Sequence, residues 1–381
     1  MKAVLGVVLA RCPRASAGHT CATMNWALTL RELGWDVWIT EHVSLEEIEP
    51  PEADGLASPQ EEFWKATAKE FGFEGRECLI VDGKSPELEA MREFAAGADL
   101  FLNYSGQFKR LDLIGPRTRK AYLDVDPAFT QLWAEVYGSD MNFAGHDVFL
   151  TVGSNVNGDT AFMPHAGREW LPMLPPVAGA DWRQRLGRSA GLPAPNAAWT
   201  TVGHWYGYGD LLWRDRTFAG KRESLLALRE LPKLSGKPSA IATDLKREWG
   251  DYDEFIESGW EFLPSEEVCR DVPSYLDFLA SSRGEIGIAK AGYVVSQGGW
   301  ISDRSLVYLA LGRPVVLQDT GWKHAVNFSK GMVPFQEVED CARAIRDIEA
   351  DYEGHSKAAL ELAETLFSSK GTLAPMLSRI L

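Results

Sequence analysis

The sequence predicts an α/β protein made of two parallel-sheet domains that face each other across a cleft. Two observations carry this prediction. Short apolar runs alternate with helical patterns in both halves of the chain, which is typical of a mostly parallel sheet covered by helices on both faces. Between the halves, the proline-rich stretches 171–176 and 191–195 cannot form a helix interior or a central strand, so the alternation stops there and then restarts.

The first half begins with the apolar run 3–10, which we interpret as a buried strand rather than the apolar part of a signal peptide. A helix is predicted next, because apolar residues recur at helical spacing from Ala22 to Leu33, directly before Gly34. Further short strands are predicted at 37–40, 79–81, 100–102, 121–123 and 148–152, and a helix at 86–96.

The second half repeats this order of elements. Strands are predicted at 199–202, 240–242, 261–263, 294–295 and 315–317, and helices at 221–231, up to 311, at 338–350 and at 356–367. The predicted limits are 1–178 for an N-terminal domain, 179–197 for a linker, 198–355 for a C-terminal domain, and 356–381 for helices that can pack back on the first domain.

Composition narrows the class of protein. The formal net charge is −15, which argues against a surface that follows phosphate backbones, so nucleic acid is not expected as a partner. The five cysteines are scattered, with no C-x-x-C pair, which fits a reducing, cytoplasmic location and argues against a zinc or redox motif. No apolar run approaches the ~20 residues that a membrane span requires.

The loop 296–305 is the most informative segment, because ligands of open parallel sheets bind beyond the carboxyl ends of the strands. Gly298 and Gly299 allow close approach to the backbone. Ser302 or Asp303 is a natural N-cap, so free N–H groups at the helix start, with Arg304 beside them, favour a phosphate or diphosphate. An ordinary capped turn between a strand and a helix fits the same residues.

The stretch from Gly298-Gly299-Trp300 to Leu311-Gly312-Arg313-Pro314-Val315-Val316 resembles the donor-binding segment of nucleotide-sugar glycosyltransferases with the GT-B fold. That fold consists of two Rossmann-like domains facing across a cleft. The resemblance is close over this segment and loose over the two-domain layout of the chain. It implies that the phosphate or ribose of the donor is contacted by Gly298, Gly299, Ser302, Asp303 and Ser305. It also implies that the hydroxyls of the donor sugar are contacted by Gln318 and Asp319.

The subfamily stays open, because the sequence departs from two patterns of the family. Retaining members commonly carry two glutamates at positions that are Gly299 and Val307 here. The inverting plant-type pattern has a histidine where this chain has Gln297. In the family, a basic residue also contacts the diphosphate; Lys221 and Lys290 are the candidates, with a solvated surface lysine as the alternative for each.

The loop after the first strand carries Gly18, His19 and Thr20, and in many GT-B enzymes this loop faces the acceptor. His19 is the candidate general base, because its ordinary pKa lies close to the working pH, and Gly18 and Thr20 are expected to bind the acceptor. A capping turn with a solvated histidine is the alternative. Asp124 and Asp126 follow a later strand; we expect Asp124 at the acceptor and Asp126 as the reserve base, although helix capping fits them equally.

The sequence therefore predicts a cytoplasmic glycosyltransferase that moves a sugar from a nucleotide-diphosphate donor to a hydroxyl of a small-molecule or glycosidic acceptor. The N-terminal domain would bind the acceptor and the C-terminal domain the donor. Neither a metal nor another cofactor is expected beside the nucleotide-sugar co-substrate, because in this fold a helix end and basic residues neutralise the leaving diphosphate. The rivals are a nucleotide-sugar epimerase of the same fold and a non-catalytic nucleotide-sugar-binding protein.

Overall fold

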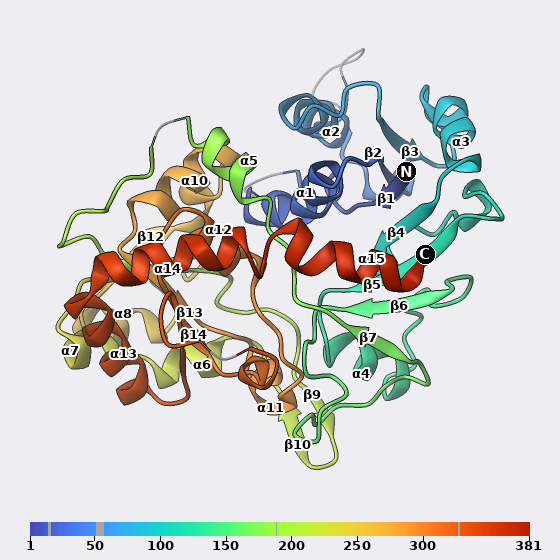
Figure 1. The fold of residues 1–381 in the computed structure, drawn as a ribbon. Coiled ribbons are helices and arrows are strands. Elements are labelled where there is room, and N and C mark those ends of the chain that lie inside the picture. Colours follow the sequence, from blue (N-terminus) through green and yellow to red (C-terminus); the bar gives the residue numbers. More distant parts are fainter. Residues whose placement is uncertain (14–16, 51–56, 188, 327) are drawn as a thin grey trace.

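The structure, a computed structural model, describes residues 1–13, 17–50, 57–187, 189–326 and 328–381. It contains two large sheets, with helices packed around each (Figure 1). The first has the strand order β3-β2-β1-β4-β5-β6-β7 and the second the order β12-β11-β8-β13-β14-β15, and all neighbouring strands in both sheets are parallel. The predicted fold class of two parallel-sheet α/β domains is confirmed.

The first sheet and its helices occupy the N-terminal half. The strands are β1 (Lys2–Gly6), β2 (Asp36–Val43), β3 (Glu77–Val81), β4 (Leu100–Tyr104), β5 (Arg119–Asp124), β6 (Val148–Thr151) and β7 (Trp170–Pro172). The helices are α1 (Ala17–Glu32), α2 (Pro59–Glu70), α3 (Leu88–Ala96), α4 (Phe129–Glu135) and α5 (Gly179–Arg185).

The second sheet is built from β8 (Trp199–Val202), β11 (Ser239–Thr243), β12 (Trp260–Pro264), β13 (Gly284–Gly287), β14 (Val315–Gln318) and β15 (Met332–Phe335). Its helices are α6 (Arg222–Ala227), α7 (Leu231–Ser235), α8 (Asp251–Glu257), α9 (Ser265–Val268), α10 (Val272–Ser281), α11 (Ala291–Ser296), α12 (Asp303–Ala310) and α13 (Val338–Ala350). A hairpin of β9 (Leu211–Trp213) and β10 (Arg216–Phe218) projects beside them, and α14 (Tyr352–Glu364) and α15 (Ala374–Ile380) end the chain (Figure 1).

Three predicted elements differ in the structure. The chain leaves the sheet after Gly6 because the amides of Leu9 and Ala10 bond to the Glu41 carboxylate. The strand predicted at 294–295 lies inside α11, and the sheet instead uses β13, whose two glycines and buried glutamate hide its strand character. The proline-rich stretch 171–176, where no element was predicted, contributes its first two residues to the edge strand β7, a position that tolerates Pro172.

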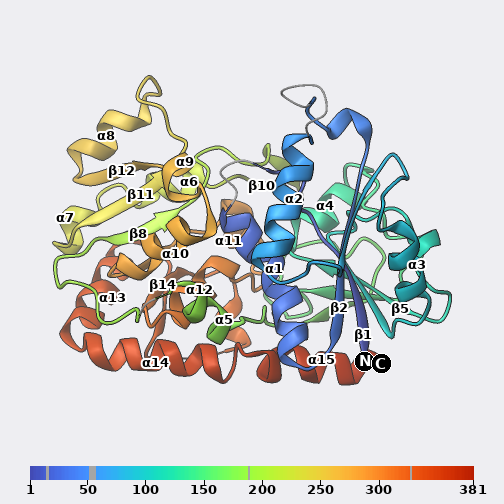
Figure 2. The same cartoon turned by 90° about the horizontal axis from the view of Figure 1, so that it is seen from above.

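Apolar side chains from both halves share one core. A single buried cluster joins Trp26 of α1 to Leu306 of α12, and the same cluster includes Met376 of α15. Figure 2 shows α14 running along the second sheet and α15 reaching the first, so that the two termini lie next to each other. The predicted domain limits stay a prediction, but a shared apolar core of this kind holds two halves in a fixed arrangement.

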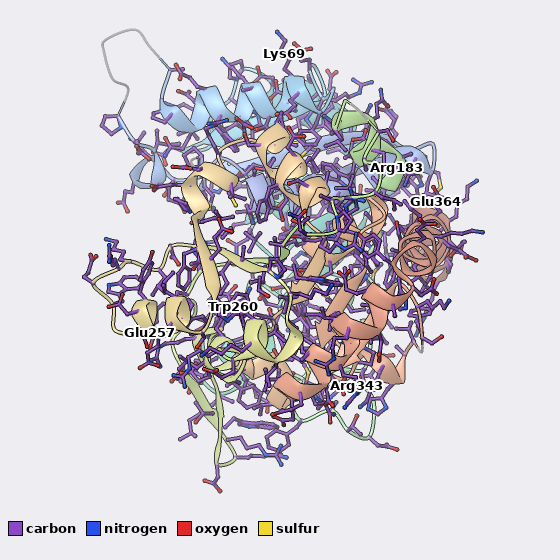
Figure 3. All side chains as sticks on the ribbon, turned by 90° about the vertical axis from the view of Figure 1, so that its left-hand side faces the viewer. Lys69, Arg183, Glu257, Trp260, Arg343 and Glu364 are labelled. Atoms are coloured by element: carbon purple, nitrogen blue, oxygen red, sulfur yellow. The ribbon has the colours of Figure 1, made fainter. Side chains whose placement is uncertain are left out.

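An ion pair fastens the C-terminal helix to the segment between the sheets. Arg183 of α5 donates to Glu364 of α14 at 2.8 Å (Figure 3) and also to the carbonyl oxygen of Ala310 at 3.1 Å. Within the described part of the chain, no helix is long and apolar enough to cross a membrane. The cytoplasmic location stays a prediction.

Candidate functional site

The loops that follow β5, β8 and β13 meet at the boundary between the two halves. Asp126 follows β5, and its carboxylate binds three side chains from the other half. Lys290 Nζ lies 2.9 Å from Oδ1, Tyr293 OH donates to the same oxygen, and Tyr208 OH donates to Oδ2 at 3.0 Å. The Lys290 ammonium also lies 3.6 Å from the centre of the Tyr208 ring. We call Lys290, Tyr293 and Tyr208 the Asp126 cradle.

The cradle controls the charge of Asp126. Burial alone raises the pKa of this carboxyl, but the positive charge of Lys290 and the hydrogen bonds from the cradle outweigh it and bring the pKa below its usual value. Asp126 is therefore ionised at neutral pH and is a weak proton acceptor. Asp126, the reserve candidate for the general base, is therefore not available to accept a proton while the cradle binds it.

Two further basic side chains lie near Lys290. Arg304, in the first turn of α12, donates from Nε to Glu285 at 2.6 Å and from Nη1 to the carbonyl oxygen of Val202 at 2.7 Å. Its Nη2 is buried without a hydrogen-bond partner among the described residues. Burial, and then the positive charges of Arg304 and Lys290, lower the pKa of Lys221 well below its usual value, and Glu285 opposes this shift. Three basic side chains thus converge at the carboxyl ends of β8 and β13.

The Gly-rich loop is engaged with the opposite half. The amides of Ser154 and Asn155 donate to the carbonyl oxygens of Gly299 and Gly298 at 3.3 and 3.0 Å, and the Ser154 hydroxyl donates to Gly299 at 2.8 Å. The Gly299 amide is bonded to the carbonyl oxygen of Thr320. The close approach that these glycines allow is therefore, in this structure, to the loop after β6, where a ligand was expected.

The start of α12 keeps polar atoms without partners. Within the described residues, the Ser302 side chain makes no capping bond, and Asp303 Oδ1 and Ser305 Oγ are buried without a hydrogen-bond partner. Ser302, Ser305 and Gln318 line a small cavity next to the ends of β13 and β14. Burial and the negative charge of Asp126 raise the pKa of Asp303 to about 7. These groups remain candidates for contact with a ligand.

Two predicted carboxylates are committed to the fold. Asp124 is completely buried and accepts hydrogen bonds from Thr130, Gln131 and Thr151, so it fastens the start of α4 and cannot bind an acceptor. The Asp319 carboxylate lies 2.6 Å from the Lys323 ammonium and also accepts from Gln336 at 3.1 Å and from the Gly321 amide. Capping and turn formation, the alternatives for such acids, use these oxygens here.

Gln318 is likewise bonded within the chain, because its Oε1 accepts from the Ala289 amide at 3.1 Å. Gly18 packs against Tyr275 of α10, and Thr20 is buried in α1. Gly18 and Thr20, both predicted to bind the acceptor, are therefore not open to a large ligand. They fix the first turn of α1 against the C-terminal half.

His19 lies in the first turn of α1, and its Nε2 is 2.6 Å from the carbonyl oxygen of Val8. A carbonyl oxygen only accepts, so Nε2 carries the proton and Nδ1 is the atom left to accept one. Burial lowers the pKa of His19, while the Val8 carbonyl and the negative charge of Asp126 oppose the shift. The ring is therefore neutral at pH 7 and lies within electrostatic reach of the cleft carboxylate.

Sequence reasoning missed Glu41 and Glu285. Glu41, in the mostly buried strand β2, accepts the amides of Leu9 and Ala10 at 2.7 Å each and shapes the loop before His19. Glu285 is completely buried and holds Arg304. An acid next to apolar residues of a strand was the available signal for both. No group of three or more His, Cys, Asp or Glu side chains in the described residues is placed to hold a metal ion.

No protein-family profile matches the chain, and no curated protein matches it in sequence. Solved structures share its fold. An alpha-glucosyltransferase in complex with UDP and a 13-mer DNA is 12% identical, with a TM-score of 0.59 over 100% of this chain and 98% of that one. HepE from Anabaena, in complex with UDP and glucose, is 13% identical, with a TM-score of 0.52 and complete coverage of both chains. A glycosyltransferase from Rickettsia africae is 11% identical, with a TM-score of 0.50 over 100% and 97%.

The chain therefore has the two-domain GT-B fold of these glycosyltransferases, as the resemblance at residues 298–316 implied. The expectation that nucleic acid is excluded as a partner was wrong. The alpha-glucosyltransferase that shares the fold was solved with DNA, so neither the fold nor a negative overall charge rules out such a partner. Net charge describes the whole surface, whereas nucleic acid binding depends on one local patch.

Proposed function

We propose that this protein transfers a sugar from a nucleotide-diphosphate donor to a hydroxyl of an acceptor. One observation carries the proposal: Lys221, Arg304 and Lys290 converge at the carboxyl ends of β8 and β13, beside unpartnered polar atoms of α12. In an open parallel sheet this is where a ligand binds, and basic side chains gathered there, cationic when protonated, fit a diphosphate. The C-terminal half would hold the donor and the N-terminal half the acceptor.

The same cations supply the chemistry of the leaving group. When the bond between sugar and phosphate breaks, negative charge builds on the diphosphate, and fixed positive groups stabilise that charge in a cleft of low polarity. Glu285 and the Val202 carbonyl hold Arg304 so that Nη2 is free for this contact. We propose that these side chains make a metal unnecessary, so activity should persist after treatment with EDTA.

Proton transfer is assigned to His19. Its Nδ1 would accept the proton of the acceptor hydroxyl as that oxygen attacks the sugar carbon, which describes an inverting reaction. We propose a small-molecule or glycosidic hydroxyl as the acceptor. Because a glucosyltransferase with this fold was solved with DNA, the acceptor screen should also contain duplex DNA carrying hydroxymethylated bases.

The decisive test is donor binding, measured by thermal shift with a panel of nucleoside diphosphates and nucleotide sugars. A ligand at 100 times its Kd adds about 2.7 kcal/mol of stability. Lys221→Met should lose most of the shift, whereas Lys233→Met, which removes an exposed lysine of α7, should keep it. A protein that gives no shift with any nucleotide would contradict the proposal.

Product analysis then separates the rival functions. A transferase slowly hydrolyses its donor without an acceptor and glycosylates the right acceptor when one is present. An epimerase returns a nucleotide sugar with changed stereochemistry, and a binding protein leaves the donor intact. NMR of the sugar products distinguishes these outcomes and also reports whether the anomeric configuration is inverted.

A further inference from the structure

We propose that the Asp126 cradle is an anion subsite of the C-terminal half, in which the Asp126 carboxylate stands in for a phosphate of the donor until the donor displaces it. The inference rests on the proposed function. It assigns Tyr208 and Tyr293, which no motif singles out as phosphate ligands, to the recognition of a nucleoside diphosphate.

The composition of the cradle supports this inference. Its ammonium and its two hydroxyls all come from the C-terminal half, and all point at one carboxylate from the other half. An ammonium and two hydroxyls suit the oxygens of a phosphate as well as those of a carboxylate. The Asp126 and Lys290 side chains each keep 21% of their surface exposed, so solvent reaches the pair.

The charges around the cradle favour exchange. Glu285 already pairs with Arg304, which leaves Asp126 as the ion-pair partner of Lys290 among the described residues. Lys221 lies close enough to Lys290 for their charges to interact, and its pKa shift records that repulsion. A diphosphate carries more negative charge than one carboxylate and can bridge several cations, so it competes well for Lys290.

A purely structural tie between the halves is the alternative. The halves are also joined by uncharged bonds, from Ser154 and Asn155 to the Gly-rich loop, and by the shared apolar core. These contacts hold the arrangement without Asp126. The two interpretations therefore predict opposite effects on ligand affinity when the Asp126 carboxylate loses its charge. If Asp126 occupies an anion subsite, the loss frees the cradle for a ligand and raises the affinity. If Asp126 only joins the halves, the loss loosens the site and does not raise the affinity.

The test is the Kd of UDP and of inorganic pyrophosphate, measured by calorimetry at constant ionic strength. Asp126→Asn, which keeps the shape and removes the charge, should bind both probes about tenfold more tightly, a coupling of ordinary size between competing ligands. Ser154→Ala removes an uncharged bond across the same boundary and should leave both Kd values unchanged. Unchanged or weaker binding by Asp126→Asn would overturn the inference.

Two more variants complete the experiment. Lys290→Met should weaken binding, and Asp126→Asn/Lys290→Met should bind no more tightly than Lys290→Met, because the gain needs the freed ammonium. Asp126→Ala has the same expected sign as Asp126→Asn and serves if the amide variant does not fold. If the folded wild type binds neither probe nor any other nucleoside diphosphate, the proposed function fails; if it binds them and Asp126→Asn gives no gain, only the inference fails.

Discussion

The Gly-rich loop before α12 and the acidic loop after β5 both cross the boundary between the halves, but they do so by different physical means. The first uses uncharged backbone bonds from Ser154 and Asn155 to Gly298 and Gly299. The second inserts the charged Asp126 into the cradle. In solution an uncharged backbone hydrogen bond competes with water, whereas a carboxylate paired with a cation can also be replaced by another anion. The two loops thus separate a permanent contact from an exchangeable one.

The largest expected effect comes from breaking the permanent contact. Gly299 has a φ of +86°, and a Cβ there would lie 2.5 Å from the Asn155 nitrogen. Gly299→Ala should therefore lower the free energy of unfolding by about 2–5 kcal/mol, from strain at positive φ and overlap with the opposite backbone. Urea unfolding measures the loss.

Gly138→Ala is the matched control, because Gly138 also has positive φ (+68°) but no atom lies within 4 Å of the added Cβ. It should cost about 1–2 kcal/mol, the strain alone. Equal losses in the two variants would show that Gly299 serves only its own turn and does not hold the halves together.

The second-largest expected effect concerns catalysis and depends on the charged contact of Asp126. Because the cradle keeps the Asp126 pKa low, the neutral His19 is the better base. His19→Ala should reduce kcat by about 100-fold or more with donor Kd nearly unchanged. In the wild type, kcat/KM should fall only as pH drops through the lowered His19 pKa, below its ordinary value, because protonation removes the base.

His324→Ala, which changes an exposed histidine in the turn after β14, is the control and should retain activity. Full activity of His19→Ala, together with loss of activity in Asp126→Asn, would transfer the role of base to Asp126. That result would also mean that the donor releases Asp126 from Lys290 before the chemical step.

The sheets were predictable from the sequence, whereas the partners of each loop were not. Alternating apolar runs and helical spacing are local signals, so most strands and helices fall where they were expected. The contacts of Gly299 with Asn155, and of Asp126 with Lys290, join residues far apart in the chain, and one sequence carries no record of such pairing. Lys221 and Lys290 were candidates because the resemblance implies a basic residue at the diphosphate, and Arg304 because it follows the Gly-rich loop at a helix start. The sequence could not show that Asp124 and Asp319 would be used by their own turns.

A third prediction compares two acids in different surroundings. Asp126 faces the Lys290 ammonium and two hydroxyls, and its pKa is lowered; Glu41 is buried and accepts mainly backbone amides, and burial raises its pKa to about 7. A carboxyl with a folded pKa above its unfolded value of 4.5 binds more protons in the folded state, so its contribution to stability falls as pH rises from about 4.5 to 7.

Glu41→Gln keeps an acceptor for the amides and removes this titration. The free energy of unfolding of the variant, relative to that of the wild type, should therefore rise by about 1–3 kcal/mol between pH 4.5 and pH 8. Urea unfolding across that pH range measures the rise. Glu62→Gln, which changes a carboxylate in the first turn of α2, is the control. Parallel pH curves for Glu41→Gln and the wild type would contradict the assignment of a raised pKa to Glu41.

The smallest expected effect tests whether charge holds the C-terminal helix in place. The pair of Arg183 and Glu364 is largely exposed, at 33% and 56%, and water screens such a pair strongly. Glu364→Gln should cost no more than about 0.5 kcal/mol, because Arg183 keeps its bond to the Ala310 carbonyl and α14 and α15 remain buried in the shared core. Met376→Ala, which removes a buried side chain of α15, should cost about 2–4 kcal/mol in the same unfolding assay. A larger loss for Glu364→Gln than for Met376→Ala would mean that the C-terminal helices are held by charge rather than by apolar packing. The difference between permanent and exchangeable contacts would then not hold at this boundary.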